Sequence, residues 1–394
     1  MRREQLEYAA SRYGTPLYIF DLDLLKKQAD RIKNALGEEI GLCYAMKANP
    51  FLTEVMAGCT DRIEVCSMGE FLICRELEIP PEKLLISGVL KKKEDIYRIL
   101  DACEGRCRYT VESIKQLHHF LEWSDEHKKV LRLYPRLTNG SQFGMDEDAV
   151  RSVFGLAAMS PYLEIEGLHY FSGTQKRHLR QFRAELEMLD DFLQKMRDEW
   201  NIQVRHLEYG PGTAVPYFEG KDAQTYTDEG FRALRDAIRS MQWKGKVTIE
   251  LGRAFAAECG SYLTEIRDVK KNGDIDYCIV DGGSHQLNYD GQIRGMYRPG
   301  IRIIPEENAG MKKHWTVCGA LCTMNDVLCG NVELSGVRTG KILVFERAGA
   351  YSAMEGMALF LSHPLPAVVS FSREDGWKTL RKSQPTYVWN MEER

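Results

Sequence analysis

The sequence predicts an α/β protein in which a TIM (β/α)8 barrel is followed by an antiparallel β-barrel or β-sandwich domain. Two observations support this prediction. Eight apolar, strand-like runs alternate with helix-like stretches over about 220 residues, which fits such a barrel in number and length. After Gly260 the pattern changes to short strand-like runs separated by turn residues, which is typical of antiparallel sheets. A doubly wound open sheet is the alternative for the first part of the chain.

The predicted barrel strands are apolar, and most of the stretches between them, such as 112–122 and 179–200, are long enough for helices. Before the first strand, residues 22–36 show helical spacing of apolar side chains. This alternation favours parallel strands joined by helices. The strands are expected at 40–45, 62–66, 84–88, 107–111, 130–134, 163–168, 204–208 and 247–251.

The predicted β domain is discontinuous. Residues 4–14 indicate a short helix and residues 16–20 a strand, and because this strand precedes the first barrel helix it can join the C-terminal sheet. We therefore expect a barrel at 24–258 and a β domain made of 1–23 and 259–394. The C-terminal strands are expected at 261–266, 277–280, 300–304, 315–318 and 341–345.

Composition and charge favour a cytoplasmic enzyme over a protein that binds nucleic acid or membrane. The formal net charge is −4, and both signs are spread along the chain. No apolar stretch approaches the roughly 18 residues of a membrane helix. The 11 cysteines are irregularly spaced without a C-x-x-C pair, so we expect reduced thiols, no disulfide and no metal. The lysine runs at 91–93 and 312–313 are expected to be solvated.

One lysine, Lys47, lies between an apolar run at 40–45 and Pro50, in the segment YAMKANP. A strand end is a rigid place to present an amine. Apolar surroundings lower a lysine pKa, which leaves a neutral amine able to bond covalently to an aldehyde. A lone lysine is more often a solvated surface residue. The assignment of Lys47 therefore depends on the residues around it.

Polar and glycine-bearing turns follow several of the other predicted strands. Active sites of TIM barrels lie at the C-terminal ends of the strands, so these turns are expected near Lys47. Glycine lets backbone amides approach a phosphate closely. Each turn alone is weak evidence, and their order and spacing are the stronger signal. The turns are 64–70, 87–88, 173–175, 210–213 and 250–253.

The Lys47 segment resembles the YAxKAN signature of fold-type III pyridoxal-phosphate enzymes, and nearly the whole chain resembles the alanine-racemase-like barrel decarboxylases that act on diaminopimelate, ornithine and arginine. The resemblance implies pyridoxal 5'-phosphate as the cofactor and Lys47 as the residue that carries it. A protonated pyridine nitrogen makes the cofactor a stronger electron sink. The other cofactor-binding residues that it implies are Glu64, Phe171, Thr174, Gly210, Gly212, Glu250, Gly252, Arg253 and Tyr351.

The resemblance also implies a role for each group of these residues. Thr174 and the segment Gly210-Pro211-Gly212 match the phosphate-binding turns, and Tyr351 matches a tyrosine that reaches the phosphate. Glu250, in a segment similar to EPGR, matches the glutamate that keeps the pyridine nitrogen protonated. A barrel-interior carboxylate paired with an arginine is the alternative for Glu250. Either Glu64 or Glu70 is expected to tune Lys47.

The segment that begins at Cys318 resembles the CGPLC motif of the same decarboxylases. In that family the second cysteine enters the site of the partner subunit as the proton donor, which implies Cys322 here and a homodimer with shared active sites. Taken alone, such a cysteine is more often a buried apolar residue. Arginine offers a bidentate fork for a distal substrate carboxylate, although the arginines of this region can equally be surface residues. The substrate-binding residues expected are Arg294, Tyr297, Arg298, Thr323 and Asp326.

Three positions depart from the family pattern. Phe171 stands where the family has a histidine stacked on the cofactor ring, and His169, two residues earlier, is not expected to inherit that task. Pro211 replaces the middle glycine of the phosphate turn and removes one amide donor. Thr323 replaces the acidic residue that recognises the distal ammonium of the substrate. These departures leave the cofactor site plausible and the substrate open.

The resemblance implies decarboxylation of an amino acid, with diaminopimelate as the default substrate. A close alternative is a decarboxylase of a modified or carrier-linked amino acid in antibiotic or siderophore biosynthesis. Further alternatives are an amino-acid racemase and a non-catalytic binding protein of the same fold. An intact Lys47, Glu250 and Cys322 argue against the non-catalytic alternative.

Overall fold

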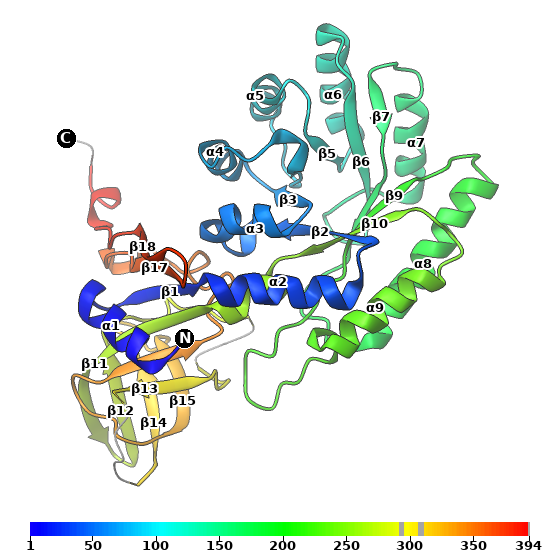
Figure 1. Cartoon of the computed structure of the whole chain (residues 1–394). Coiled ribbons are helices and arrows are strands. Elements are labelled where there is room, and N and C mark those ends of the chain that lie inside the picture. The colour runs from blue at the N-terminus through cyan, green and yellow to red at the C-terminus, as the bar shows by residue number, and fades with distance from the viewer. Residues whose placement is uncertain (291–294, 306–310, 393–394) are drawn as a thin grey trace. The chain divides into compact units, whose positions relative to one another are not determined.

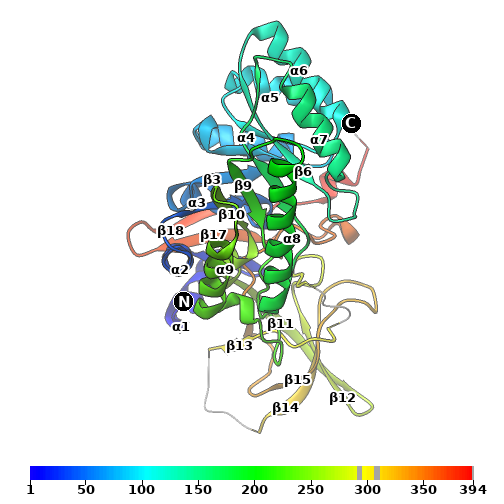
Figure 2. The ribbon, with the colours of Figure 1, turned by 90° about the vertical axis from the view of Figure 1, so that its right-hand side faces the viewer.

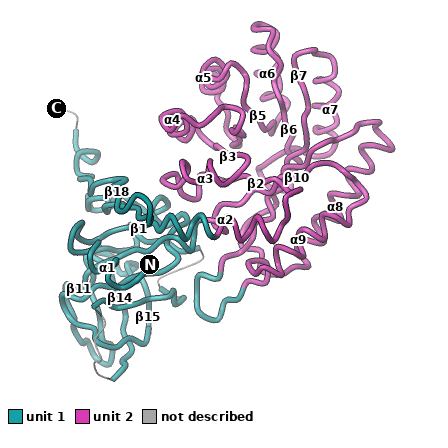
Figure 3. Tube along the Cα trace, viewed as in Figure 1, with its two compact units in different colours: residues 1–27, 216–222, 256–394 teal, residues 28–215, 223–255 magenta. Residues whose placement is uncertain are grey.

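The computed structural model of the chain describes residues 1–290, 295–305 and 311–392, and it divides into two compact units. Figure 3 distinguishes them by colour: one comprises residues 28–215 and 223–255, and the other comprises residues 1–27, 216–222 and 256–394. Helix α2 (Leu22–Leu36) runs across the boundary. Each unit has its own sheet.

The unit of residues 28–215 and 223–255 contains a closed barrel of eight parallel strands, which confirms the predicted TIM fold. The strands pair in the order β5-β4-β3-β2-β10-β9-β8-β6, and β5 also pairs with β6 to close the ring. Figure 1 shows these strands surrounded by helices of the same unit. The barrel strands are β2 (Ile40–Ala45), β3 (Arg62–Val65), β4 (Leu84–Ile86), β5 (Arg108–Val111), β6 (Leu131–Leu137), β8 (Leu168–Phe171), β9 (His206–Gly210) and β10 (Lys246–Leu251).

The predicted strand at 163–168 is wrong in its bounds. The structure has two short strands there, β7 (Leu163–Ile165), which pairs only with β6 among the described strands, and the barrel strand β8. The strand is interrupted between them at Gly167, where a Cβ would lie 2.4 Å from the carbonyl oxygen of His206. The apolar run in the sequence therefore gives no sign that two backbone segments approach each other closely at this point.

Helices follow most of the barrel strands and bury their apolar faces against them. Helices α8 and α9 lie side by side, as Figure 2 shows. None of the helices in the described ranges is both long enough and apolar enough to cross a membrane. Besides α2, the helices are α3 (Thr53–Cys59), α4 (Met68–Glu76), α5 (Lys93–Cys103), α6 (Ile114–His127), α7 (Glu147–Ala157), α8 (Leu179–Asp198), α9 (Asp228–Ser240) and α10 (Arg253–Ala256).

A buried polar cluster lies at the N-terminal ends of β3 and β9. The guanidinium of Arg62 forms an ion pair with the carboxylate of Glu208 and lies 3.4 Å from Glu166. His206 is held from both sides, with Nε2 at 2.8 Å from Thr248 Oγ1 and Nδ1 at 3.2 Å from the Tyr134 hydroxyl. Burial and the nearby Arg62 lower the pKa of His206 to about 3. His206 is therefore neutral in the folded protein at neutral pH.

Because His206 is buried as a neutral ring, we expect the free energy of unfolding to decrease in acid. The folded pKa of His206 lies below the ordinary value of 6.5, so the stability it contributes is complete above pH 6.5 and is lost as the pH falls towards 3. Between pH 7.5 and pH 5 this loss amounts to about 2 kcal/mol. We expect His206→Gln to lose less unfolding free energy than the wild type over this interval, measured by urea denaturation. The exposed His118→Gln should behave like the wild type, and equal losses in His206→Gln and wild type would contradict the prediction.

The other unit is built on a mostly antiparallel sheet with strand order β15-β14-β12-β11-β1-β17-β18. Strand β16 pairs with β11 and β13 pairs with β16, whereas β1 with β17 and β12 with β14 are parallel pairs. The elements are α1 (Arg3–Tyr13), β1 (Leu17–Asp21), β11 (Gly260–Asn272), β12 (Ile275–Val280), β13 (Ile301–Ile304), β14 (Lys313–Cys318), β15 (Val327–Leu334), β16 (Ile342–Glu346), β17 (Ala367–Ser372) and β18 (Gly376–Arg381).

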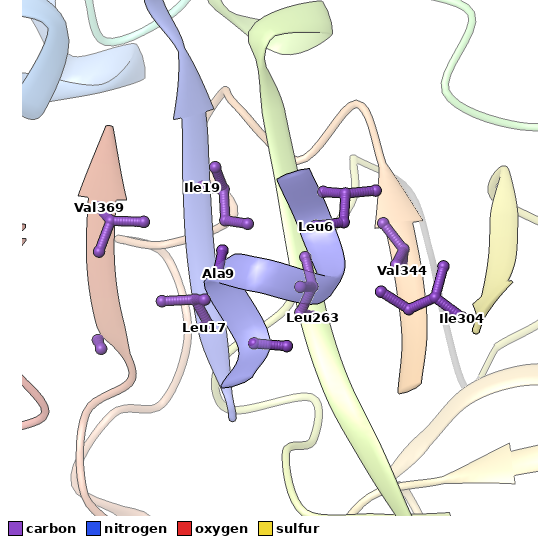
Figure 4. Packing of buried hydrophobic residues seen from close by; sticks show 10 residues of the cluster. Leu6, Ala9, Leu17, Ile19, Leu263, Ile304, Val344 and Val369 are labelled. Carbon is purple, nitrogen blue, oxygen red and sulfur yellow. The ribbon is translucent and has the colours of Figure 1, made fainter. Parts of the chain in front are cut away.

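Helix α1 covers one face of this sheet. Figure 4 shows Leu6 and Ala9 of the helix directed at apolar side chains from the strands, among them Leu17 and Leu263. All four side chains are fully buried. Strand β1 lies between β11 and β17, and its inward side chains join the first residues of the chain to the C-terminal strands. Burial of this cluster stabilises the unit by the hydrophobic effect.

Candidate active site

Lys47 lies directly after strand β2, in a short 3₁₀ turn (Met46–Ala48). The residues around it fix the backbone of this turn. The buried Tyr44 donates its hydroxyl hydrogen to the carbonyl of Asn49 at 2.9 Å, and the Asn49 side chain accepts from the amide of Phe51. Pro50 begins the next turn, as expected for a residue that cannot extend the strand. The side chain of Lys47 is 42% exposed, so the amine is accessible.

The carboxylate that contacts Lys47 is Glu64, at the end of β3. Lys47 Nζ lies 2.6 Å from Glu64 Oε2 and 3.6 Å from the sulfur of Cys66. Burial alone would raise the pKa of Glu64, but the charge and hydrogen bond of Lys47 outweigh it and lower the pKa to about 2. Glu70, the other candidate, accepts from the amide of Cys66 at 2.6 Å at the start of α4. Glu70 therefore binds the backbone just before helix α4, whose N-cap is Ser67, and Glu64 holds the lysine.

A second buried carboxylate, Glu250, lies near the end of β10. Strand β10 pairs with β2, with Glu250 opposite Cys43 and Leu251 opposite Tyr44. Gly252 permits this approach, since a Cβ there would lie 2.9 Å from the Cβ of Ala48. Glu250 Oε1 is 3.0 Å from Nε2 of His169, so this contact is made by a histidine and not by an arginine, as the alternative for Glu250 would have it. Arg253 follows in α10 and is nearly buried.

Two glycine turns form a narrow cradle after β8 and β9. Gly210 lies opposite Phe171, and a Cβ on Gly210 would lie 2.4 Å from that ring. Gly212 has a φ of +65°, and a Cβ there would lie 1.8 Å from the carbonyl oxygen of Gly173. Thr174 is exposed beside this contact. The backbones of the two loops therefore approach each other closely at Gly173 and Gly212, where amide groups can contact an anionic group.

These residues fit pyridoxal phosphate. An accessible lysine amine with a carboxylate partner, a buried carboxylate on a neighbouring strand and two backbone-lined turns are the three kinds of contact that an aldehyde, a protonated pyridine and a phosphate require. Cys43, Glu208 and Glu250 also bring one possible metal-ligating atom each within 4.8 Å of one another. Burial raises the pKa of the Cys43 thiol, and the carboxylate of Glu208 forms an ion pair with Arg62. We therefore assign no metal to these three residues.

The cradle gives a prediction with a matched control. Gly212→Ala should weaken cofactor binding by about 10-fold or more, because the new methyl group forces the two loops apart and also strains the left-handed backbone. Gly220→Ala has the same φ of +65° but nothing within 4 Å of the new Cβ, so it isolates the backbone strain. The dissociation constant of pyridoxal phosphate, measured by fluorescence titration, should change less than about 3-fold in Gly220→Ala. Equal losses in both variants would contradict the steric argument.

The remaining predicted site residues that the structure describes lie in the other unit, on loops beside its sheet. Cys322 is exposed. The carboxylate of Asp326 is buried, and it accepts from the amides of Ser284 and Leu321, both at 2.7 Å. Thr323 accepts from the amide of Asn325 through its hydroxyl oxygen at 3.3 Å. Asp326 therefore shapes the loop that presents Cys322 and Thr323.

Tyr351, Tyr297 and Arg298 belong to this second group as well. Tyr351 has a left-handed φ of 64°, which is rare for a residue with a bulky side chain. The ring of Tyr297 lies 5.0 Å from that of Phe218, and the backbone carbonyl of Arg298 accepts from the amide of Glu219. Arg294 lies outside the described residues. The predicted site residues thus form two groups, one in each unit.

Several polar residues at the C-terminal end of the barrel have no signal in the sequence. Lys91 was expected to be solvated, and this was wrong: its amine contacts the Gly88 carbonyl, Thr110 and Gln116, and burial lowers its pKa to about 8. Arg136 and Glu112 form a buried ion pair at 3.2 Å. No local signal separates Lys91 from its exposed neighbour Lys92, because the difference arises from contacts with β5 and α6. His169 and Cys66 were likewise not predicted to contact the site carboxylates.

The fold and this group of residues define a barrel enzyme that uses a lysine amine, and the comparisons identify its family. The family described as pyridoxal-dependent decarboxylase, pyridoxal binding domain, matches residues 22–257. The chain therefore belongs to the pyridoxal-dependent decarboxylases, which use pyridoxal phosphate to decarboxylate amino acids. The family, fold and cofactor predicted from the sequence are confirmed.

Three individual proteins illustrate the similarity. The chain is 26% identical to the diaminopimelate decarboxylase of Aquifex aeolicus, over 88% of this chain and 84% of that protein. It is 24% identical to the L-glutamyl-[BtrI acyl-carrier protein] decarboxylase of Niallia circulans, over 97% and 95% of the two chains. The structure of the M. jannaschii diaminopimelate decarboxylase in complex with L-lysine matches with a TM-score of 0.86 at 23% identity, covering 98% and 94% of the chains.

Proposed function

We propose that this decarboxylase acts on a free α-amino acid of the diaminopimelate type and that Lys47 is its central residue. The observation that carries the proposal is the 2.6 Å contact between an accessible lysine amine and the buried carboxylate of Glu64 at the C-terminal end of the barrel. A substrate with a second charged end is supported by the relatives, among which a diaminopimelate decarboxylase has been seen with L-lysine.

Each residue of the barrel group has a task in this proposal. Lys47 binds the cofactor covalently, and Glu64 orients its amine through the 2.6 Å contact. Glu250 faces the ring nitrogen, Phe171 packs on the ring, and the turns at Thr174, Gly210 and Gly212 hold the phosphate. When bound, the cofactor supplies an electron sink for the negative charge that remains on the α-carbon after carbon dioxide leaves. Gly252 lets the end of β10 approach the Lys47 turn, and Arg253, which follows it, contributes to cofactor binding.

The second group of residues completes the reaction. Cys322 donates its Sγ proton to the α-carbon, and solvent returns a proton to the sulfur. Tyr351 reaches the phosphate, while Thr323, Tyr297 and Arg298 recognise the distal end of the substrate. In domain terms, residues 24–258 bind the cofactor, and residues 1–23 with 259–394 supply the proton donor and the specificity. The match of the family to residues 22–257 supports this division.

We also propose a cytoplasmic homodimer in which Cys322 serves the active site of the partner subunit. Support comes from the loop itself, where Cys322 is exposed and the neighbouring Met324 is 94% exposed while buried Asp326 anchors the loop. An exposed thiol on an anchored loop is accessible to a second subunit. Mixing inactive Lys47→Ala and Cys322→Ala proteins under subunit exchange should restore up to about a quarter of the wild-type sites, by random pairing. No recovery, with exchange verified by mass, would refute shared sites.

A substrate panel tests the proposed reaction. Purified protein with pyridoxal phosphate should release carbon dioxide from diaminopimelate and form lysine, detected by trapped gas and chromatography. Release from a carrier-linked glutamate and not from diaminopimelate would support the alternative of a carrier-linked substrate. Loss of optical rotation without carbon dioxide would indicate a racemase. Tight cofactor binding without turnover of any amino acid would indicate a binding protein.

A further inference from the structure

Four buried carboxylates among the described residues of the barrel unit each have a basic partner. Glu64 pairs with Lys47 at 2.6 Å, Glu112 with Arg136 at 3.2 Å, Glu208 with Arg62, and Glu250 with His169 at 3.0 Å. Lysine and arginine carry full charges at neutral pH when paired in this way. Histidine is the one base whose charge changes near neutral pH. The carboxylate that we assign to the ring nitrogen is therefore the one whose partner is an imidazole.

The contacts of His169 indicate which form of the ring is present. The side chain is 1% exposed, and Nε2 lies at hydrogen-bond distance from Oε1 of Glu250, so Nε2 must carry a proton and donate it. Nδ1 is buried and has no hydrogen-bond partner among the described residues. A proton on Nδ1 would create a buried donor without an acceptor, which costs more than an unused acceptor lone pair. The geometry favours the neutral ring with its hydrogen on Nε2.

A neutral donor has a different effect on Glu250 from that of a cation. It fixes the orientation of the carboxylate through one oxygen and leaves the negative charge in place. A cationic partner would instead compete with any second cation that approached the carboxylate. Glu64 and Glu208 each contact their own cation, and burial keeps Cys43 protonated by raising its pKa. These neighbours therefore do not change the effect that a neutral or a cationic partner has on Glu250.

We propose that His169 is a positioning residue for the cofactor: as a neutral donor it holds one oxygen of Glu250 and leaves the other oxygen and the charge for the protonated ring nitrogen. This inference rests on the proposal that Glu250 faces that nitrogen. The imidazole that the family places over the ring is thus replaced by Phe171 here, and the imidazole of His169 acts on the ring nitrogen through Glu250.

The test measures binding of two probes to protein freed of cofactor. One probe is pyridoxal phosphate, and the other is its analogue with carbon in place of the ring nitrogen. His169→Phe and His169→Leu remove the donor. They should raise the dissociation constant of pyridoxal phosphate by about 10-fold and change that of the analogue by less than about 2-fold. His169→Gln keeps a neutral donor and should bind both probes within about 3-fold of wild type. Binding of the analogue also shows that each variant is folded.

Several results would overturn the proposal. Equal weakening of both probes would mean that His169 only supports the fold, and tighter binding of pyridoxal phosphate by His169→Gln would mean that the imidazole is a competing cation. Glu250→Gln separates this inference from the site assignment on which it rests. If Glu250→Gln does not weaken pyridoxal phosphate relative to the analogue, the assignment of Glu250 is wrong. If Glu250→Gln weakens binding of pyridoxal phosphate relative to the analogue and the His169 variants do not, only the role of His169 is refuted.

Discussion

Replacing Lys47 with alanine is expected to lower kcat/KM for carbon dioxide release by at least about 10³-fold, because the variant loses both the covalent attachment of the cofactor and a group that can move protons. Borohydride reduction followed by denaturation should leave pyridoxal phosphate on the Lys47 peptide of the wild type and none on the variant. Lys92→Ala, which removes an exposed lysine, is the control and should retain both activity and attachment. Covalent cofactor in the reduced Lys47→Ala protein would refute the assignment.

The same substitution should destabilise the cofactor-free protein. Burial raises the pKa of Glu64, but the contact with Lys47 outweighs it and holds the pKa at about 2, below the ordinary 4.5. The pair therefore stabilises the fold above pH 4.5, and this stabilisation is lost as the pH falls towards 2. At pH 7 the loss in Lys47→Ala should be about 1–3 kcal/mol, reduced because the lysine is partly exposed. Adding Glu64→Gln should restore the unfolding free energy but not the activity.

Local sequence was sufficient where one strand end determines the geometry. The turn around Lys47 depends on Tyr44, Asn49 and Pro50, all within three residues of it, and all lie where the sequence predicts. The barrel itself follows from repeated strand and helix patterns, which are also local. The second domain was harder, since β1 pairs with β11 and β17 from the far end of the chain.

Contacts between strands were beyond what periodicity can predict. His169 and Glu250 are 81 residues apart and meet because β8 and β10 both flank β9. Lys91 and Lys92 are indistinguishable in the sequence, although only Lys91 folds inward onto Thr110 and Gln116. Asp326 matches a substrate-binding pattern, yet its carboxylate accepts two backbone amides. The residue types were therefore predictable, whereas their partners required the tertiary structure.

The largest expected effect on specificity concerns Thr323. A substrate ammonium that is buried without a counter-charge costs several kcal/mol, and a threonine cannot supply that charge. Lysine and diaminopimelate carry the same distal ammonium and differ only in the distal carboxylate. We therefore expect the wild type to prefer diaminopimelate to lysine and ornithine by about 10²-fold in kcat/KM, with recognition through the carboxylate. Arg298→Gln should reduce this preference, measured as initial rates of carbon dioxide release.

Adding a carboxylate to the loop tests the same argument in the opposite direction. Thr323→Glu should shift preference towards lysine and ornithine by roughly 10²-fold, because the new charge offsets the desolvation of their ammonium group. Met159→Glu places the same charge on a side chain of the barrel unit that is 75% exposed, and it should leave the preference nearly unchanged. If the wild type decarboxylates ornithine as efficiently as diaminopimelate, or if both glutamate variants shift equally, Thr323 does not determine specificity.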